Sequence, residues 1–438
     1  MAFFGDDFTG STDALETLEE MGVATILFTD VPSAAQLRAH AGKQAIGIAG
    51  MSRAMPTAEI GPYLRTAFEH IRELEPAHVH YKVCSTFDSS PAVGSIGKAI
   101  DVGSSVFGAA PIPLVVGAPH LGRYCVFGNL FARMGTAANG AVFRLDRHPS
   151  MSKHPVTPAD ESDLSLHLAR QTDKKIGLVD VNDLGKPLAS VARTVNAKVA
   201  RGDEVVLFDT LTTGHLLKIG RIIDAMAEKR GKPVFSVGSS AVSNALCAAW
   251  VKDGSAAPRT DWPELKTMGP LLVMSGSCSP VTAKQIEWAL RHGFAHIPVD
   301  ATTPASDAIQ SLRAGKSVIV HTGTVSGDGR VRITTKGTAG HYGEALARIA
   351  DEVLSRFSVA GLIVAGGDTS SLFARAIGIR AVEMVARGVR GAPFCKAHSD
   401  RPHIDGLIVA FKGGQVGDVD YFTDMQGRIA PNQTKDRT

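Results

Sequence analysis

Two adjacent carboxylates, Asp6 and Asp7, lie in the segment 5–11, between a short apolar run and a stretch with helical periodicity. Carboxylates beside a hydroxyl-rich helix start can accept hydrogen bonds from a polyol or serve as a general base, and the helix N-terminal amides can receive an anion. Aspartate is also an ordinary N-cap residue, so a purely structural cap is an equal alternative. Both roles stay open for these two residues.

Three further segments place cations and hydroxyls after predicted strands. The residues concerned are Ser52 and Arg53 after the run 45–49, Lys82, Ser85, Thr86 and Asp88 at the end of the run 78–83, and Arg123 after the run 113–118. If these strands are neighbours, the cations converge with Asp6 and Asp7 on one pocket, which suits a small hydroxylated acid. For Arg53 the alternative is a surface salt bridge.

The second half of the chain has small glycine- and hydroxyl-rich turns after its apolar runs, at 275–279, 322–324, 366–370 and 412–417. Backbone amides at such turns, opening into helix N-termini, can hold a polyphosphate. Asp368 could approach a divalent cation, and Lys412 could neutralise phosphate charge. Tight connections between strands and helices also use such turns, but their number in one half favours a nucleotide site.

The elements that must position these residues alternate as short apolar runs and amphipathic stretches of helical length. This pattern predicts an α/β protein of two domains, each a mainly parallel sheet flanked by helices, with an active-site cleft between them. The segment 252–270 is rich in glycine, proline and charge. We therefore expect an N-terminal domain at 1–255, a linker at 256–269 and a C-terminal domain at 270–438.

Composition narrows the functional class. A formal net charge of +3 over 438 residues does not favour binding to nucleic acid or to membranes. Five scattered cysteines without a CxxC pair, and no recognisable leader segment, favour a reduced cytoplasmic protein. The chain has no GxSxG, HExxH or strict GxGxxG after its first run, which disfavours hydrolases, zinc proteins and conventional dehydrogenases.

The motifs together resemble those of the four-carbon acid sugar kinase family. They are GDDFTGSTD at 5–13, YKVCSTFDSSP at 81–91, SGSCSP at 275–280, GGDTS at 366–370 and KGGQVG at 412–417. The resemblance implies an N-terminal acid-sugar domain, a C-terminal ATP domain, and phosphorylation of a terminal hydroxyl with ATP and Mg²⁺. The residues Cys-Ser-Thr-Phe-Asp at 84–88 resemble the 3-oxo-tetronate branch, so 3-oxo-tetronate is favoured, with threonate or erythronate next.

The resemblance also assigns roles. It assigns Asp6, Asp7, Ser52, Arg53 and Lys82 to the sugar acid, to which Ser85, Thr86 and Arg123 are added as candidates. We expect Asp6 or Asp7 to be the catalytic residue that accepts the proton of the attacking hydroxyl. The resemblance implies nucleotide binding by the following set, in which Asp368 is also the metal candidate: Ser275, Ser277, Gly366, Gly367, Asp368, Thr369, Gly413 and Gly414. The expected partners are a small sugar acid and, as an optional assembly, a second copy in a homodimer. The alternative functions are a non-catalytic sugar-acid-binding protein and an NAD-linked sugar-acid oxidoreductase.

Overall fold

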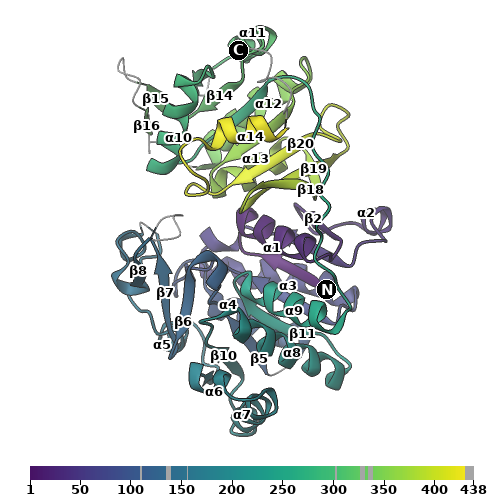
Figure 1. Ribbon diagram of the computed structural model, residues 1–438, viewed down its shortest axis with the longest axis vertical. Coiled ribbons are helices and arrows are strands. Elements are labelled where there is room, and N and C mark those ends of the chain that lie inside the picture. The colour runs from purple at the N-terminus through teal and green to yellow at the C-terminus, as the bar shows by residue number, and fades with distance from the viewer. Residues whose placement is uncertain are drawn as a thin grey trace. The chain divides into compact units, whose positions relative to one another are not determined.

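The computed structural model describes residues 1–108, 111–134, 140–154, 156–300, 303–325, 331–333 and 339–429. The chain divides into two compact units. The first comprises residues 1–25 and 31–259, and the second comprises residues 26–30 and 260–438. No helix among the described residues has the length and apolar character needed to cross a membrane. Figure 1 labels the elements.

The first unit is built on a seven-stranded parallel sheet. In spatial order its strands are β3 (Ala45–Ala49), β1 (Ala2–Gly5), β4 (His78–Lys82), β11 (Val234–Gly238), β5 (Ile112–Val115), β10 (Val205–Phe208) and β9 (Ile176–Val179). Most of these strands are short apolar runs buried on both faces, as expected for a sheet covered by helices. The predicted parallel sheet is confirmed in this unit.

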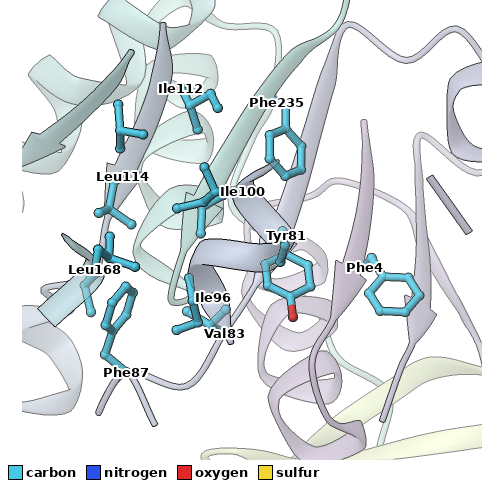
Figure 2. Packing of buried hydrophobic residues seen from close by; sticks show 14 of the residues in the cluster. Phe4, Tyr81, Val83, Phe87, Ile96, Ile100, Ile112, Leu114, Leu168 and Phe235 are labelled. Atoms are coloured by element: carbon cyan, nitrogen blue, oxygen red, sulfur yellow. The ribbon is translucent and has the colours of Figure 1, made fainter. Parts of the chain in front are cut away.

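Helices cover both faces of this sheet. The core on one face includes side chains of α3 (Thr57–Glu73) and α4 (Ile96–Phe107), among them Ile100, which lies near Tyr81 and Phe235 in Figure 2. The core on the other face includes side chains of α7 (Leu188–Ala200), α8 (Thr213–Arg230) and α9 (Ala241–Asp253). The alternation along β10, with Leu207 in the first core and Phe208 in the second, reflects the twofold side-chain period of a strand.

The remaining elements of the first unit are mostly short. They are α1 (Phe8–Glu20), α2 (Ala34–Ala39), α5 (Leu164–Ala169), α6 (Val181–Gly185), the antiparallel strands β6 (Arg123–Val126), β7 (Asn129–Arg133) and β8 (Val142–Arg144), and the 3-10 turns Ser52–Ala54, Pro119–Leu121, Leu145–Arg147 and Met151–Lys153.

The second unit has a mixed sheet. Its parallel strands, in spatial order, are β13 (Ala295–Pro298), β14 (Val318–His321), β12 (Leu271–Ser275), β17 (Gly361–Ala365) and β20 (Ile408–Lys412). Three antiparallel strands follow: β19 (Ala392–Ser399), β18 (Ile379–Val389) and β2 (Thr25–Phe28). The sequence predicts a strand over 23–29 among those of the first half, but β2 pairs with β18, with Phe28 opposite Ala381.

The helices of the second unit are α10 (Pro280–Arg291), α11 (Ser306–Arg313), α12 (Ala339–Leu354), α13 (Gly367–Ala376) and α14 (Tyr421–Ile429), and a separate two-stranded ribbon is formed by β15 (Gly323–Val325) and β16 (Val331–Ile333). Two of these helices, α10 and α13, begin within five residues of the carboxyl ends of β12 and β17. Their N-termini therefore lie at the edge of the sheet where ligands of α/β proteins collect.

Candidate functional site

The first candidate site lies at the carboxyl ends of three neighbouring parallel strands of the first unit. Gly5 of β1 is in register with Lys82 of β4, and Lys82 is in register with Gly238 of β11. The residues that follow each strand therefore emerge side by side. The first of them, Asp6, donates its N–H to the Lys82 carbonyl at 2.8 Å.

Arg53 holds the two adjacent carboxylates. Its Nη2 and Nε donate to the two oxygens of Asp6 at 2.7 and 3.2 Å, and its Nη1 donates to Asp7 Oδ2 at 2.7 Å. Both aspartates are buried. Burial raises the pKa of Asp6, and the Arg53 charge opposes that rise. The expected convergence of Arg53 with Asp6 and Asp7 is present, and two of the five N–H donors of Arg53 have no acceptor among the described residues.

Asp7 also caps α1. Its Oδ1 accepts the Gly10 N–H at 2.7 Å and its Oδ2 accepts the Thr9 hydroxyl at 2.8 Å. The capping role that the sequence left open is therefore confirmed. A Cβ built on Gly10 would lie 2.4 Å from Asp7 Oδ1 and 3.1 Å from Lys82 Nζ. Glycine at this position lets the carboxylate and the amine approach the first turn of α1.

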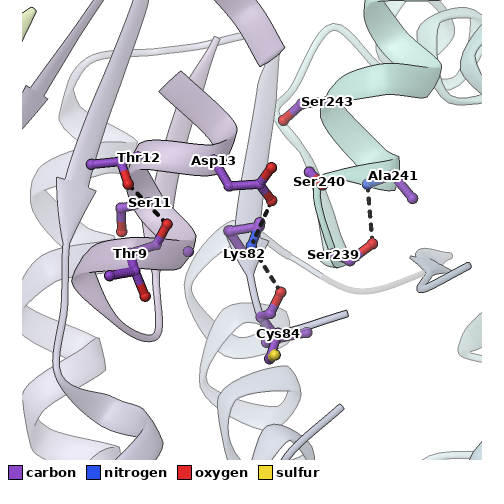
Figure 3. Close-up of polar contacts among 12 residues, drawn as sticks. Thr9, Ser11, Thr12, Asp13, Lys82, Cys84, Ser239, Ser240, Ala241 and Ser243 are labelled. Atoms are coloured by element: carbon purple, nitrogen blue, oxygen red, sulfur yellow. Dashed lines mark hydrogen bonds and ion pairs between the residues drawn. The ribbon is translucent and has the colours of Figure 1, made fainter. Parts of the chain in front are cut away.

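Lys82 and Ser52 lie behind this carboxylate pair. The buried Nζ of Lys82 donates to the Val83 carbonyl at 3.1 Å and lies 3.5 Å from Asp13 Oδ2, as Figure 3 shows. The buried hydroxyl of Ser52 is 2.9 Å from the phenol oxygen of Tyr81. Among the described residues, one N–H of the Lys82 amine thus has no acceptor, whereas Ser52 contacts the core.

The segment after β4 brings Cys84 near Arg53. Burial raises the pKa of the Cys84 thiol to about 11, and the nearby charges of Asp88 and Arg53 act on it in opposite directions. The buried Thr86 hydroxyl is 2.9 Å from Cys84 Sγ, and Ser85 beside it is half-buried. Thr86 therefore contacts Cys84, which interacts electrostatically with Arg53.

Two further features mark this region. Phe87 is a buried non-glycine residue with φ of 57°, a strained conformation that often accompanies binding loops. Arg123 also interacts electrostatically with Cys84 and Asp88. Its Nη1 donates to the carbonyls of Leu121 and Arg133, while its buried Nε has no partner among the described residues.

Sequence reasoning missed a further part of this site. Ser239 and Ser240 follow β11 directly, so they emerge beside Lys82 and Val83, and the Val83 N–H donates to the Gly238 carbonyl at 2.8 Å. Both serines are fully buried, and α9 begins at the next residue. The rule that directs attention to strand exits would have found them.

The second candidate site is formed by three turns of the second unit, which follow the adjacent strands β12, β17 and β20. A Cβ on Gly276 would lie 2.4 Å from Thr369 Oγ1, and one on Gly414 would lie 2.9 Å from Ser277 Oγ. Gly366, with φ of 120°, would bring a Cβ within 2.9 Å of Thr369 Oγ1. The three turns therefore touch, and side chains on their glycines would fill the space between them.

The other predicted nucleotide residues lie in the same turns. Ser275 ends β12, and its carbonyl accepts the Thr322 N–H at 3.1 Å. Gly367 and Asp368 open α13, and Asp368 acts electrostatically on the Cys278 thiol of the neighbouring turn. Gly413 follows β20, and its Cβ position is 3.5 Å from Val416.

A buried amine lies beneath these turns. Lys412 is fully buried, and its Nζ donates to Thr282 Oγ1 at 3.2 Å and lies 5.3 Å from the centre of the Tyr421 ring. Thr282 in turn donates to the Gly414 carbonyl and accepts from Ser277 Oγ. Burial lowers the pKa of Lys412 to about 7. Among the described residues no carboxylate lies within ion-pair distance of this amine, so an anionic ligand would stabilise its charge.

Comparison with known proteins also divides the chain into two parts. A family described as a sugar-binding N-terminal domain matches residues 1–246, and one described as a nucleotide-binding C-terminal domain matches residues 272–422. Crystal structures of proteins from Salmonella typhimurium and Haemophilus influenzae share the fold, with TM-scores of 0.78 and 0.72 at 24% identity, covering 97% and 98% of this chain and 97% and 100% of theirs.

Two curated relatives are kinases. The chain is 41% identical to a 3-oxo-isoapionate kinase of Paraburkholderia graminis, over 98% of this chain and 95% of that protein. It is 30% identical to a 3-oxo-tetronate kinase of Methylobacterium radiotolerans, over 95% of this chain and 96% of that protein. Together with the nucleotide-binding domain, these relatives identify an ATP-dependent sugar-acid kinase. The predicted resemblance is thereby confirmed, and the chain belongs to the four-carbon acid sugar kinase family.

Proposed function

We propose that this kinase transfers the γ-phosphoryl group of ATP to the terminal hydroxyl of a 3-oxo sugar acid. The observation that carries the proposal is that one chain holds two strand-exit sites of different chemistry. Carboxylates and cations surround Asp6 in the first unit, which suits a hydroxylated acid, and glycine turns surround Lys412 in the second, which suits a polyphosphate. Phosphoryl transfer requires the hydroxyl and the γ-phosphate to meet, so both ligands must be bound at once.

The names of the relatives narrow the substrate. The relative at 41% identity is a 3-oxo-isoapionate kinase, whereas relatives at 26 to 30% are 3-oxo-tetronate kinases. The higher identity supports 3-oxo-isoapionate as the first candidate. The motifs of this chain favour 3-oxo-tetronate, which is the second, and threonate and erythronate follow.

In the proposed reaction the hydroxyl oxygen forms a bond to the γ-phosphorus while the bond from that phosphorus to the β,γ-bridging oxygen breaks and ADP leaves. The hydroxyl proton passes to Asp6 or Asp7. Asp6 is the stronger candidate, because burial raises its pKa and its carboxylate is hydrogen-bonded by Arg53 and by no other described residue, whereas Asp7 also caps α1. Arg53 holds both carboxylates in place and has two N–H donors left for the substrate.

On the nucleotide side, we assign the phosphates to the amides of the turns at 276–279, 366–369 and 413–414 and to the amine of Lys412. Mg²⁺ bound with the nucleotide would neutralise charge on the phosphate oxygens. Among the described residues no group of three potential ligands for a metal is present, and Asp368 is the one carboxylate of the predicted nucleotide residues. This arrangement fits Mg²⁺, which commonly takes one or two carboxylates together with phosphates.

The test is a substrate panel. Purified protein, ATP and Mg²⁺ are incubated with 3-oxo-isoapionate, 3-oxo-tetronate, threonate and erythronate, and ADP release and the phosphorylated product are measured. We expect a kcat/KM at least tenfold higher for one of the 3-oxo acids than for threonate or erythronate. An equal kcat/KM for threonate or erythronate would refute the substrate proposal. ADP release without a phosphorylated acid would refute the proposed reaction.

We also propose a cytoplasmic location and, as the assembly to be tested, a homodimer. All five cysteines are free thiols, which suits a reducing compartment. Fractionation of cells that express the tagged protein, followed by size-exclusion chromatography with light scattering, tests both statements.

A further inference from the structure

The end of β11 and the start of α9 form a polar turn inside the first site. Gly238 is in register with Lys82, and Ser239 and Ser240 follow it. The Ser239 hydroxyl donates to the Val116 carbonyl at 2.7 Å and accepts the Ala241 N–H at 3.1 Å. Figure 3 draws this turn beside Lys82 and Asp13. Ser239 therefore shapes the turn and has little left for a ligand.

Ser240 is different, because its hydroxyl and its N–H have no partner among the described residues, whereas its carbonyl accepts from the N–H and the side-chain amide of Asn244. Its side chain is fully buried, its Oγ makes no hydrogen bond, and it does not cap α9 although it occupies the N-cap position. Its N–H also donates to no acceptor in that part of the chain. Burying a hydroxyl without a partner is unfavourable by about 1–3 kcal/mol. Such a group at a strand exit points to a ligand that supplies the acceptor.

The charges around the turn show why a bound acid would need the donors of Ser240. The cluster holds three carboxylates, Asp6, Asp7 and Asp13, against two cations, Arg53 and Lys82. His80, on β4, adds no positive charge, because burial lowers its pKa to about 3. An acid that enters this site meets cations that are already compensated. Free donors at a helix N-terminus can stabilise its carboxylate without a further cation.

We propose that the first turn of α9 binds the carboxylate of the sugar acid, with the Oγ and N–H of Ser240 as donors and the remaining N–H of Lys82 beside them. This inference rests on the proposed function, since it names the group that orients the acid in the same site. The α9 helix has 13 residues, which is long enough for its N-terminal amides to favour an anion. Arg53 then serves chiefly to hold the two aspartates.

The test is Ser240→Ala, compared with Thr212→Ala. Thr212 is the N-cap of α8, likewise makes no capping hydrogen bond, and is exposed away from this turn. A hydrogen bond to a charged group is worth about 1.5–3 kcal/mol, so we expect Ser240→Ala to raise the KM for the acid by roughly 10- to 150-fold. Its KM for ATP should stay at the wild-type value and its Tm should not fall below that of wild type, because no existing hydrogen bond is lost and an unpaired buried hydroxyl is removed. Thr212→Ala should leave every one of these values unchanged.

A second measurement separates binding of the carboxylate from a general structural effect. The carboxamide of the same acid is neutral, so wild type and Ser240→Ala should bind it with affinities within about threefold of each other in calorimetry without ATP. An unchanged KM for the acid in Ser240→Ala overturns the inference while leaving the kinase reaction intact, as does an equal loss of affinity for acid and carboxamide. If the wild-type protein binds and phosphorylates no sugar acid, the proposed function fails and the inference fails with it.

Discussion

Lys412→Met tests whether the buried amine of the second unit is kept for a phosphate ligand. Burial lowers the pKa of Lys412 from 10.5 to about 7. At about 1.4 kcal/mol for each pH unit, this difference corresponds to a penalty of roughly 5 kcal/mol on the folded, nucleotide-free protein. Methionine has a similar shape and no charge. The variant loses the hydrogen bond to Thr282, worth about 1 kcal/mol, and the contact of the charged amine with the Tyr421 ring, worth up to about 2 kcal/mol. Together these losses are smaller than the penalty, so we expect the variant to be more stable than wild type at pH 7.

The lowered pKa of Lys412 also predicts how the stabilisation by Lys412→Met changes with pH. In the unfolded chain the amine stays protonated up to about pH 10.5, whereas in the folded chain it loses its proton near pH 7. Between these values the unfolded state binds more protons, so the wild-type stability rises with pH, and below pH 7 the full penalty remains. The stabilisation by Lys412→Met should therefore be largest at or below pH 7 and should fade toward pH 10.

Calorimetry and kinetics on one set of variants provide the assay. Each 1 kcal/mol gained in the free energy of unfolding should raise the Tm of a unit of this size by about 2–4 °C. The KM for ATP should rise at least tenfold in Lys412→Met, since a charge-assisted contact to phosphate is lost. The matched control is Lys316→Met, at an exposed lysine of the same unit, and should change neither quantity. A Lys412→Met protein that is less stable at pH 7 and has the wild-type KM for ATP would refute the reasoning.

Three further variants separate structure from chemistry. Asp7→Asn keeps a good N-cap residue but loses the charge and the ion pair with Arg53, so its Tm should fall below that of wild type, and kcat should fall about 100-fold or more if Asp7 accepts the proton. Asp7→Ala also loses the cap, so it should be less stable than Asp7→Asn by about 1 kcal/mol in chemical denaturation. Arg53→Met leaves the Asp6 and Asp7 carboxylates uncompensated, so the free energy of unfolding at pH 7 should fall by about 3 kcal/mol, and by less at acid pH, where the carboxylates bind protons. Gly276→Ala places a Cβ 2.4 Å from Thr369 Oγ1, so the KM for ATP should rise tenfold or more in steady-state kinetics while the KM for the acid is unchanged.

Other outcomes would contradict these expectations. An Asp7→Asn protein with wild-type kcat would leave Asp6 as the remaining candidate base. Wild-type stability in Arg53→Met would mean that the two ion pairs contribute little to folding. A Gly276→Ala protein with an unchanged KM for ATP would remove this turn from the nucleotide site, and Gly185→Ala, at a glycine with nothing near its Cβ position, is the control for a neutral substitution.

The parallel strands could be predicted because they are short apolar runs buried on both faces. The expected run 45–49 coincides with β3, and the run 361–365 coincides with β17. The hairpin of β18 and β19 could not be predicted in the same way. Its long first strand alternates between buried and exposed positions, and its register shifts between Met384 and Ala386 and again before Val389. These irregularities break the simple twofold period on which a strand prediction depends.

Part of the first site could also be predicted, because parallel strands place their carboxyl ends at one edge. The meeting of Asp6, Arg53 and Lys82 follows from that rule. The sequence could not predict that Arg53 would contact both aspartates, since this depends on the order of the strands. The sequence does not single out Ser240, because what marks this residue is the burial of its hydroxyl without a partner, which depends on how β11 and α9 pack. In the second unit the glycine turns were predictable, but the full burial of Lys412 depends on side chains from α10 and α14.

The most direct test of the account is a crystal structure of the protein with ADP, Mg²⁺ and the 3-oxo acid that the substrate panel selects. We predict the ADP phosphates against the turns at 276–279, 366–369 and 413–414, with an oxygen within hydrogen-bond distance of Lys412 Nζ. We predict the acid at the carboxyl ends of β1, β4 and β11, with its carboxylate on Ser240. Nucleotide bound among residues 5–123 instead, or an acid bound away from Asp6 and Ser240, would contradict the assignment of the two sites.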